Sequence, residues 1–524
     1  MSPQADGGVP GWVRDAIVYQ IFPDRFASSE RVAKPGPLEA WDAPPTRNGF
    51  KGGDLLGVVE HLDHIQQLGA DTISLNPVFA SASNHRYHPY DYFAVDPLLG
   101  GDAALRELID AAHARGMRVI LDGVFNHAGR GFWPFHHVLE VGRHSPYRDW
   151  FHLDRRRLAS GRRPHAYPSD QVDEELDASW PERHAAGRES LHRLGYRAWW
   201  DLPALPKLNL GNRQVRGYLL NVVEHWLRFG ADGWRLDAVD DVRDRSFWRD
   251  LRARARAANP DAYLLAEVWH ARPALVRGDT FDALMNYPFL AATLSFAGGP
   301  RIDAGLVSRH FGLRDRIRPI DGPGFARRLD RLVNRYRADV AQAQLNLVDG
   351  HDTPRLLSVC SSDVASARLA VLVQATVPGV PCVYYGYEIG LPGGLDPDSR
   401  RAFPWDRGRW NEGLLAYTRW ALALRRDSAV LRRGAFRVLA ARGGALAWLR
   451  SDGRDALVVA ANNAERETVL RVRAEQLAGR RLDPVAPPGG RDDSGTAPRD
   501  VALQRDGSLA IRLEARSGVV LRIV

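Results

Sequence analysis

The sequence predicts an α/β protein: a (β/α)8 TIM barrel with a domain inserted after the third strand and a C-terminal antiparallel β-domain. Three observations carry this prediction. Short, continuously apolar runs alternate with helix-period segments from residue 16 to residue 425, which is typical of parallel barrels. One connection between these runs is far longer than the others. After residue 432 the chain changes to short strand-like runs divided by Gly, Asp and Asn.

Eight apolar runs are the predicted barrel strands, because strands buried on both faces lose the alternation of polar and apolar residues. They are Ala16–Phe22, Asp71–Phe79, Met117–Phe125, Gly233–Ala238, Ala262–Val268, Thr280–Pro288, Gln344–Gly350 and Pro381–Glu388. The segments between them have the spacing of amphipathic helices. Leu105, Leu108, Ile109 and Ala112 form one apolar stripe, and another helix is expected to start near Asn212.

The long connection covers residues 128–208 and is rich in His, Arg, Trp and Pro. Connections in βα units usually have about 2–6 residues, so we predict an inserted domain here that overhangs the carboxyl ends of the strands. The barrel then comprises residues 1–127 and 209–430. Residues 431–524, with six short strand-like runs, are predicted to form a β-sandwich.

The overall composition argues against several classes of protein. The formal charge is +8, but the basic residues are scattered, nearly all are Arg, and the lysines are Lys34, Lys51 and Lys207. Nucleic-acid binding is therefore not expected. No apolar run approaches the roughly 20 residues that a membrane helix needs. Cys360 and Cys382 are expected to be reduced and buried, and the N-terminus lacks the pattern of a secretory signal, so a cytoplasmic location is predicted.

Four strings place polar residues at the ends of apolar runs. They are ILDGVFNH (Ile120–His127), DGWRLDA (Asp232–Ala238), YLLAEVWH (Tyr263–His270) and LNLVDGHD (Leu345–Asp352). The carboxyl ends of barrel strands meet at one face, where barrel enzymes build their active sites. The four strings therefore predict a shared catalytic site.

Arg235 and Asp237 are two residues apart on one predicted strand, so their side chains point the same way. By themselves they fit a buried ion pair as well as an ionised nucleophile beside a cation. Glu267 decides between the two, because a carboxyl after four apolar residues is costly without partners or a function. Next to Trp269, loss of contact with water is expected to raise the pKa of this carboxyl, as a general acid requires. Carboxyls about 5 Å apart are the pair of a retaining glycosidase.

Asp352 adds a third acid, with His351 before it and His127 at the end of the first string. A metal site is the alternative for such a cluster, but no HxH or HExxH spacing occurs, so no metal is expected. Asp122 is placed to orient the arginine. Asn126 is placed to bind substrate hydroxyls or to tie down the inserted domain.

These strings resemble the four conserved regions of the α-amylase family, glycoside hydrolase family 13, and the resemblance covers essentially the whole chain. It implies that Asp237 is the nucleophile, Glu267 the general acid/base and Asp352 the stabiliser of the transition state. It implies that Tyr87, as an aromatic platform, and His127, Arg235 and His351 contact the sugar at the cleavage point. Asp122, Asn126 and Trp269 are further candidate substrate-binding residues.

VYQIFPDRFA (Val18–Ala27), SASNHRY (Ser81–Tyr87) and LPKLN (Leu205–Asn209) look like the neopullulanase, cyclomaltodextrinase and maltogenic amylase group. That group usually carries an N-terminal β-domain, which this chain is expected to lack because its first strand begins at Ala16. Residues Ser28–Trp41 hold few clustered acids, so the sequence gives no support for a structural calcium ion, and no cofactor is expected.

The implied function is that of a retaining α-glucan hydrolase, which cleaves the α-1,4 or α-1,6 glucosidic bonds of maltodextrins or related oligosaccharides. An α-glucan transglycosylase on the same scaffold is the nearest alternative, because a sugar hydroxyl can replace water in the second step. A non-catalytic glucan-binding homologue is the more distant one, since such proteins lose a catalytic acid and this chain keeps all three. The sequence leaves the oligomeric state open.

Overall fold

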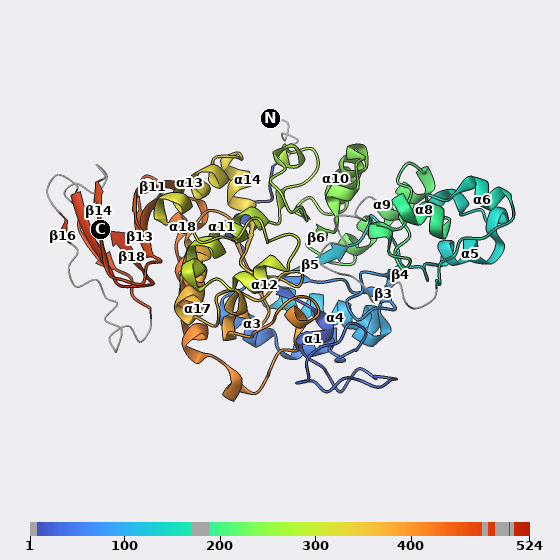
Figure 1. Ribbon diagram of the computed structural model, residues 1–524, viewed down its shortest axis with the longest axis horizontal. Coiled ribbons are helices and arrows are strands. Elements are labelled where there is room, and N and C mark those ends of the chain that lie inside the picture. Colours follow the sequence, from blue (N-terminus) through green and yellow to red (C-terminus); the bar gives the residue numbers. More distant parts are fainter. Residues whose placement is uncertain (1–7, 169–187, 474–479, 488–501, 504–507) are drawn as a thin grey trace.

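The computed structural model describes residues 8–168, 188–473, 480–487, 502–503 and 508–524. Parts of the predicted inserted domain (169–187) and of the predicted C-terminal domain therefore lie outside the described residues. Figure 1 shows the barrel in the centre, the segment inserted after β5 at one end and the C-terminal strands at the other.

The predicted barrel is confirmed. Its eight strands run parallel in the order β8-β7-β6-β5-β2-β1-β10-β9, and a parallel bridge between Met285 and Leu345 closes the ring from β8 to β9. The strands are β1 (Val18–Ile21), β2 (Thr72–Leu75), β5 (Arg118–Gly123), β6 (Gly233–Leu236), β7 (Tyr263–Ala266), β8 (Ala283–Leu284), β9 (Leu345–Leu347) and β10 (Val380–Tyr384). Seven of them lie within one predicted run each, and β10 begins one residue before its predicted run, at Val380.

Helices surround this ring and bury the apolar stripes that the sequence shows. The longer ones are α4 (Gly101–Ala114), α9 (Arg213–Arg228), α10 (Arg245–Ala258), α11 (Tyr287–Gly298), α13 (Gly322–Val333), α16 (Val364–Thr376) and α17 (Glu412–Asp427). Leu105, Leu108, Ile109 and Ala112 are all buried on α4, as predicted. Asn212 caps α9 by accepting hydrogen bonds from two amides of its first turn, which explains the start of that helix.

Two elements differ from the prediction. The run Thr280–Pro288 yields only the two-residue strand β8, because Asn286 accepts a hydrogen bond from the Phe289 amide and begins α11. A small hairpin that the sequence did not predict, β3 (Phe79–Ser81) and β4 (Pro89–Val95), follows β2. Tyr87 lies in the loop of this hairpin.

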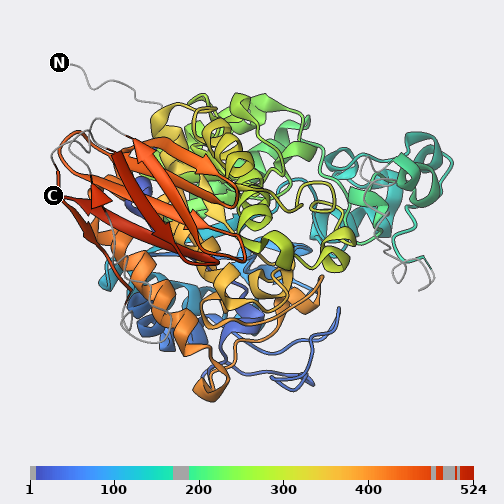
Figure 2. The same ribbon diagram turned by 60° about the vertical axis from the view of Figure 1, so that its left-hand side comes forward.

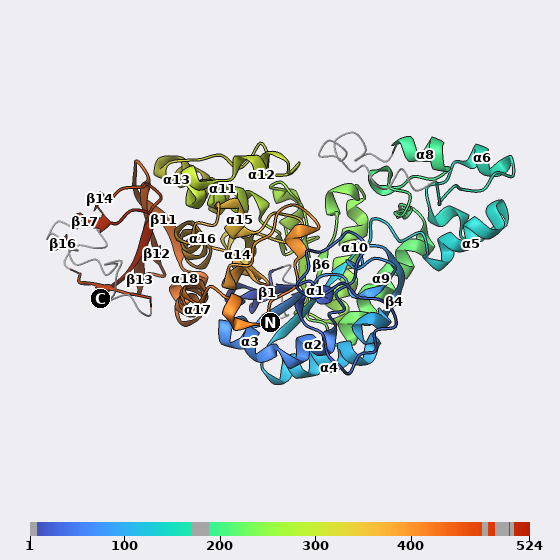
Figure 3. The same ribbon diagram turned by 60° about the horizontal axis from the view of Figure 1, so that its bottom comes forward.

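The described part of the insertion after β5 contains short helices, namely α5 (Trp133–Val141), α6 (Arg155–Ala159) and α8 (Arg188–Leu194). Figure 3 shows them standing clear of the barrel helices on one side. Isolated bridges from His127 to Lys207 and from Phe151 to Leu208 join the two ends of this segment. The bridges hold the insertion against the carboxyl end of β5.

The C-terminal residues form two antiparallel sheets packed on their own apolar core, and all six predicted strand runs are strands (Figure 2). One sheet has the order β11-β12-β13-β18-β15 and the other β14-β17-β16. The strands are β11 (Ala435–Arg442), β12 (Ala445–Ser451), β13 (Ala456–Asn462), β14 (Thr468–Arg473), β15 (Leu482–Pro484), β16 (Ala502–Leu503), β17 (Ser508–Leu513) and β18 (Ser517–Ile523).

The buried side chain of Asn463 ties these sheets to the barrel. Its amide nitrogen donates to the Phe296 carbonyl at 2.8 Å and to the Ile320 carbonyl at 2.9 Å. Both cysteines are free and buried, as expected. Among the residues that the structure describes, no helix is long and apolar enough to cross a membrane.

Candidate active site

The carboxyl ends of β5 and β6 bring one arginine against two aspartates. Nη1 of Arg235 donates to Oδ1 of Asp237 at 2.7 Å and to the Asp122 carboxylate at 2.9 and 3.0 Å. All three side chains are buried. Oδ2 of Asp237 is buried as well and has no hydrogen-bond partner among the described residues. One oxygen of this carboxylate is therefore fixed, and the other has no partner among the described residues.

Glu267, at the end of β7, lies beside this pair. Its Oε2 accepts a hydrogen bond from the amide of Ala238 at 2.8 Å and lies 3.4 Å from Nη2 of Arg235. Its Oε1 accepts from Nε1 of Trp269 at 3.1 Å. Asp237 and Glu267 thus contact the two terminal nitrogens of the same guanidinium. The predicted convergence of neighbouring strand ends is confirmed.

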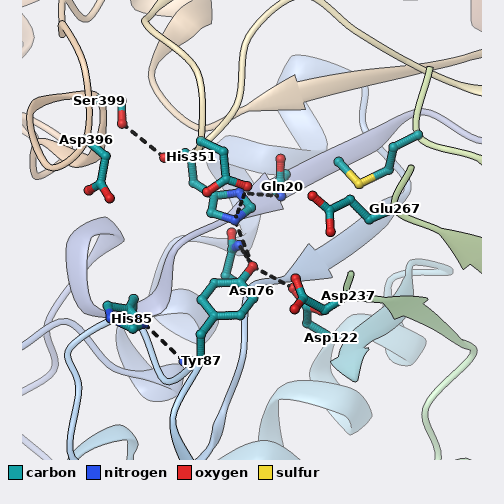
Figure 4. A network of polar contacts seen from close by, with 12 residues as sticks. Gln20, Asn76, His85, Tyr87, Asp122, Asp237, Glu267, His351, Asp396 and Ser399 are labelled. Carbon is teal, nitrogen blue, oxygen red and sulfur yellow. Dashed lines mark hydrogen bonds and ion pairs between the residues drawn. The ribbon is translucent and has the colours of Figure 1, made fainter. Parts of the chain in front are cut away.

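Tyr87 connects the arginine cluster to His351. Its hydroxyl donates to Oδ2 of Asp122 at 2.9 Å, accepts from the Asn76 amide at 3.0 Å and lies 2.7 Å from Nε2 of His351. Figure 4 shows the ring reaching between His351 and the two aspartates. The Tyr87 and His351 rings are also parallel, with centroids 5.5 Å apart. The two residues form one rigid aromatic wall.

Asp352 lies at the same ring nitrogen of His351 as Tyr87 does. Its carboxylate lies 3.0 Å from Nε2 of His351 and 3.2 Å from Nη2 of Arg400. The Gln20 amide is 3.4 Å from Nδ1 of His351, which assigns the ring proton to Nε2, where Tyr87 and Asp352 can accept it. Unlike Asp237, Asp352 is only partly buried. Part of the Asp352 side chain is therefore accessible to solvent.

His127 belongs to the wall formed by the insertion. Its Nε2 lies 3.1 Å from the Tyr87 carbonyl, and its ring stacks on Trp199 with centroids 4.7 Å apart. The buried Asn126 side chain contacts the His127 ring at 3.2 Å, and the backbone carbonyl of Asn126 accepts a hydrogen bond from the Leu208 amide at 3.1 Å. Asn126 thus ties down the insertion. On the other side of the site Trp269 stacks on Tyr287.

Burial dominates the electrostatics of the cluster. It raises the pKa of Asp122 to about 6, against the opposing charge of Arg235. Burial also raises the pKa of Asp237 well above its ordinary value; Arg235 opposes this, while the Glu267 and Asp122 charges add to it. Three carboxyl groups share one guanidinium, so the cluster holds a proton more readily than isolated carboxyls do. Burial lowers the pKa of His127 to about 3.

The sequence analysis missed several side chains that hold the site together. Gln20 and Asn76 lie at the ends of β1 and β2, and Arg400 follows β10. His310 lies 2.6 Å from the Asp352 carbonyl through Nε2. Gln20 and Asn76 could have been found from the sequence, because they are polar residues at the ends of the apolar runs that form β1 and β2. Among the described residues, no group of three or more His, Cys, Asp or Glu could hold a metal ion.

Buried carboxyl groups gathered around one arginine at the carboxyl face of a (β/α)8 barrel define the class: this is a barrel glycoside hydrolase. The chain belongs to the α-amylase family, whose catalytic-domain model (Alpha amylase, catalytic domain) matches residues 20–425.

The relatives agree with this assignment. A cyclomaltodextrinase of a Bacillus species is 39% identical over 481 residues, which cover 91% of this chain and 77% of the relative. Neopullulanase 2 of Thermoactinomyces vulgaris is 36% identical over 467 residues, 88% of this chain and 72% of the relative. The structure of a debranching enzyme from Nostoc punctiforme superposes with a TM-score of 0.84 at 38% identity, covering 98% of this chain and 99% of that chain.

Proposed function

We propose that this chain is a retaining α-glucan hydrolase that cleaves α-1,4 glucosidic bonds of maltodextrins and related oligosaccharides, with α-1,6 bonds as further substrates. One observation carries the proposal: Asp237 is bound through Oδ1 to Arg235, whereas its buried Oδ2 has no partner among the described residues. A nucleophile needs such an arrangement, with its orientation fixed and one lone pair unused.

In the first step Oδ2 of Asp237 attacks the anomeric carbon while Glu267 gives its proton to the departing glycosidic oxygen. A glycosyl ester to Asp237 forms. In the second step Glu267 takes a proton from water, which attacks the same carbon and releases Asp237. Only side chains of this chain and water take part, so we propose that the reaction needs no cofactor.

The remaining groups would bind and polarise the sugar. The Tyr87–His351 wall offers a flat aromatic face, and Asp352 lies where it can stabilise positive charge as it develops. Burial lowers the pKa of His351 well below its ordinary value, so its ring is neutral and serves as a hydrogen-bond donor. Arg235 and Asp122 fix the nucleophile, and His127, Asn126 and Trp269 complete the walls of the site.

The names of the relatives support α-glucan substrates but differ in the bond they indicate: two are a cyclomaltodextrinase and a neopullulanase, and one is a debranching enzyme. The experiment is product chromatography after incubation with maltotriose, β-cyclodextrin, pullulan and starch. We expect fast cleavage of the small oligosaccharides and slow attack on starch. Preferential cleavage of starch would overturn the oligosaccharide preference.

Two further measurements complete the assignment. The first product released should be the α-anomer by NMR; a β-anomer would contradict the retaining mechanism. Products longer than the starting sugar at high substrate concentration would show that transglycosylation dominates. We also propose a cytoplasmic location, which the two free and buried cysteines support.

A further inference from the structure

A cavity of about 630 Å³ lies in the inserted segment, away from the residues of the active site. The turns after α5 and the helix α6 form one side of it, and residues between Leu191 and Asn209 form the other. The described lining contains four arginines and one carboxylate, Asp149. The arginines are Arg143, Arg148, Arg155 and Arg197.

Arg197 is the least satisfied of these side chains. No residue that the structure describes forms an ion pair with it, and its Nε atom is buried without a hydrogen-bond partner. Other buried arginines of the described chain have oxygen partners: Arg252 and Arg256 each lie 2.8 Å from the carboxylate of Asp282, and Arg450 donates to the carbonyls of Thr376 and Gly434. Removing a guanidinium from water without a counter-charge costs free energy that an anionic ligand would recover.

In the described lining, the arginines outnumber the carboxylates. Arg155 lies 3.4 Å and Arg148 3.8 Å from the carboxylate of Asp149, so one negative charge is shared by two cations. Arg143 donates to the His144 ring and to the Ala159 carbonyl, which are neutral acceptors. Within the described lining, four guanidinium groups therefore face one carboxylate.

The positive charge of the nearby arginine also affects the pKa of His152, a histidine in the same lining. Burial, together with the charges of Arg197 and Lys207, lowers the pKa of His152 to about 4. Its ring is therefore neutral at pH 7 and is available as a hydrogen-bond donor or acceptor. Asn209 adds a neutral polar group, and Phe151 and Leu158 add apolar surface.

We propose that this cavity is a binding site for a phosphate-bearing sugar. Guanidinium groups recognise phosphate through paired N–H donors, and Arg197 and Arg143 supply them here. The volume is in the range of small-molecule sites, roughly 300–1,000 Å³, and far exceeds what inorganic phosphate fills. The polar and apolar groups beside the arginines suit the hydroxyls and ring of a sugar. This site is separate from the catalytic cluster and does not rest on the function proposed for it.

The test is titration calorimetry on the full chain at low ionic strength, with glucose 1-phosphate, inorganic phosphate and glucose as separate probes. We expect saturable binding of glucose 1-phosphate, weaker binding of phosphate and no binding of glucose that depends on Arg197. Arg197→Gln and Arg143→Gln should each weaken glucose 1-phosphate binding by about tenfold or more, which is about 1.4 kcal/mol. Arg162→Gln, an exposed arginine outside the lining, is the matched control and should bind as the parent does.

The active site could also bind the sugar probe, so Tyr87→Ala is measured in parallel. Binding that is lost in Tyr87→Ala and kept in Arg197→Gln would overturn the proposal. Equal affinity for phosphate and glucose 1-phosphate would overturn the sugar component, and absence of saturable binding would overturn the site. Circular dichroism of each variant confirms that the fold is intact.

Discussion

Nη1 of Arg235 lies 2.7 Å from Oδ1 of Asp237, two residues further along the same strand end. The same nitrogen also bonds both oxygens of Asp122, so the guanidinium cannot turn away from Asp237 without breaking contacts on β5. This pairing fixes one carboxylate oxygen and leaves the other, which is buried, without a hydrogen-bond partner among the described residues. The following predictions depend on it and on the contacts around it.

Asp237→Asn should lower kcat by at least about a thousandfold, because an amide is a poor nucleophile at an anomeric carbon. Glu267→Gln should have a similar effect on substrates with poor leaving groups, since it removes the proton donor. Steady-state kinetics on maltotriose, with thermal unfolding to verify the fold, provides the measurement. Near-normal kcat in either folded variant would rule out the assigned roles.

Tyr87→Phe should keep the aromatic wall but remove the hydroxyl that contacts Asn76, Asp122 and His351. We expect kcat/KM to fall by about 10- to 100-fold, the equivalent of one or two lost hydrogen bonds to polar or charged groups. Tyr336→Phe, in the segment between α13 and α14 (Ala338–Ala343), is the control and should leave the kinetics unchanged. Equal effects of the two changes would contradict a positioning role for the Tyr87 hydroxyl.

Activity should fall as the pH drops through about 6. Burial raises the pKa of Asp122 to about 6 and also raises that of Asp237, so both groups gain protons well above the pH at which free carboxyls do. Protonation weakens the pairing with Arg235 and removes the nucleophile's charge. The acidic limb of the kcat/KM profile against pH measures this protonation. Its apparent pKa describes the coupled carboxyl groups together and not one residue. A limb near pH 4 would contradict the prediction.

The histidines should not produce that limb. Burial lowers the pKa of His127 to about 3 and that of His351 well below its ordinary value, so both rings stay neutral through this range. Asp122→Asn separates the two explanations. It should move the limb if the carboxylates titrate, whereas an unmoved limb would point to another group.

Asn463→Ala should destabilise the junction between the C-terminal sheets and the barrel. The change leaves the Phe296 and Ile320 carbonyls without their donor in a buried place, at a cost of about 2–4 kcal/mol. The midpoint of urea unfolding should fall, while kcat at low temperature stays the same because the site is distant in the barrel. Asn334→Ala, whose exposed amide bonds only Asp330 among described residues, is the control and should shift the midpoint little.

The barrel and the carboxylates that gather at its carboxyl face could be predicted because their signals are local. Each barrel strand reads as an apolar run, and Glu267 is conspicuous because a carboxyl at the end of such a run is costly. The β3–β4 hairpin gave no such signal. Buried positions on β4 recur every third residue rather than every second, so no strand alternation is visible in its sequence.

The sequence by itself determined the order of strands, the four polar strand ends and the residue types that meet there, because periodicity and the cost of burying charge act over a few residues. The tertiary structure alone shows which oxygen of Asp237 bonds Arg235, which groups face each ring nitrogen of His351, and that Arg197 lines a cavity with three other arginines and has no ion-pair partner among the described residues. Those outcomes depend on contacts between residues far apart in the chain, such as Tyr87 and His351, and no local pattern encodes such distances.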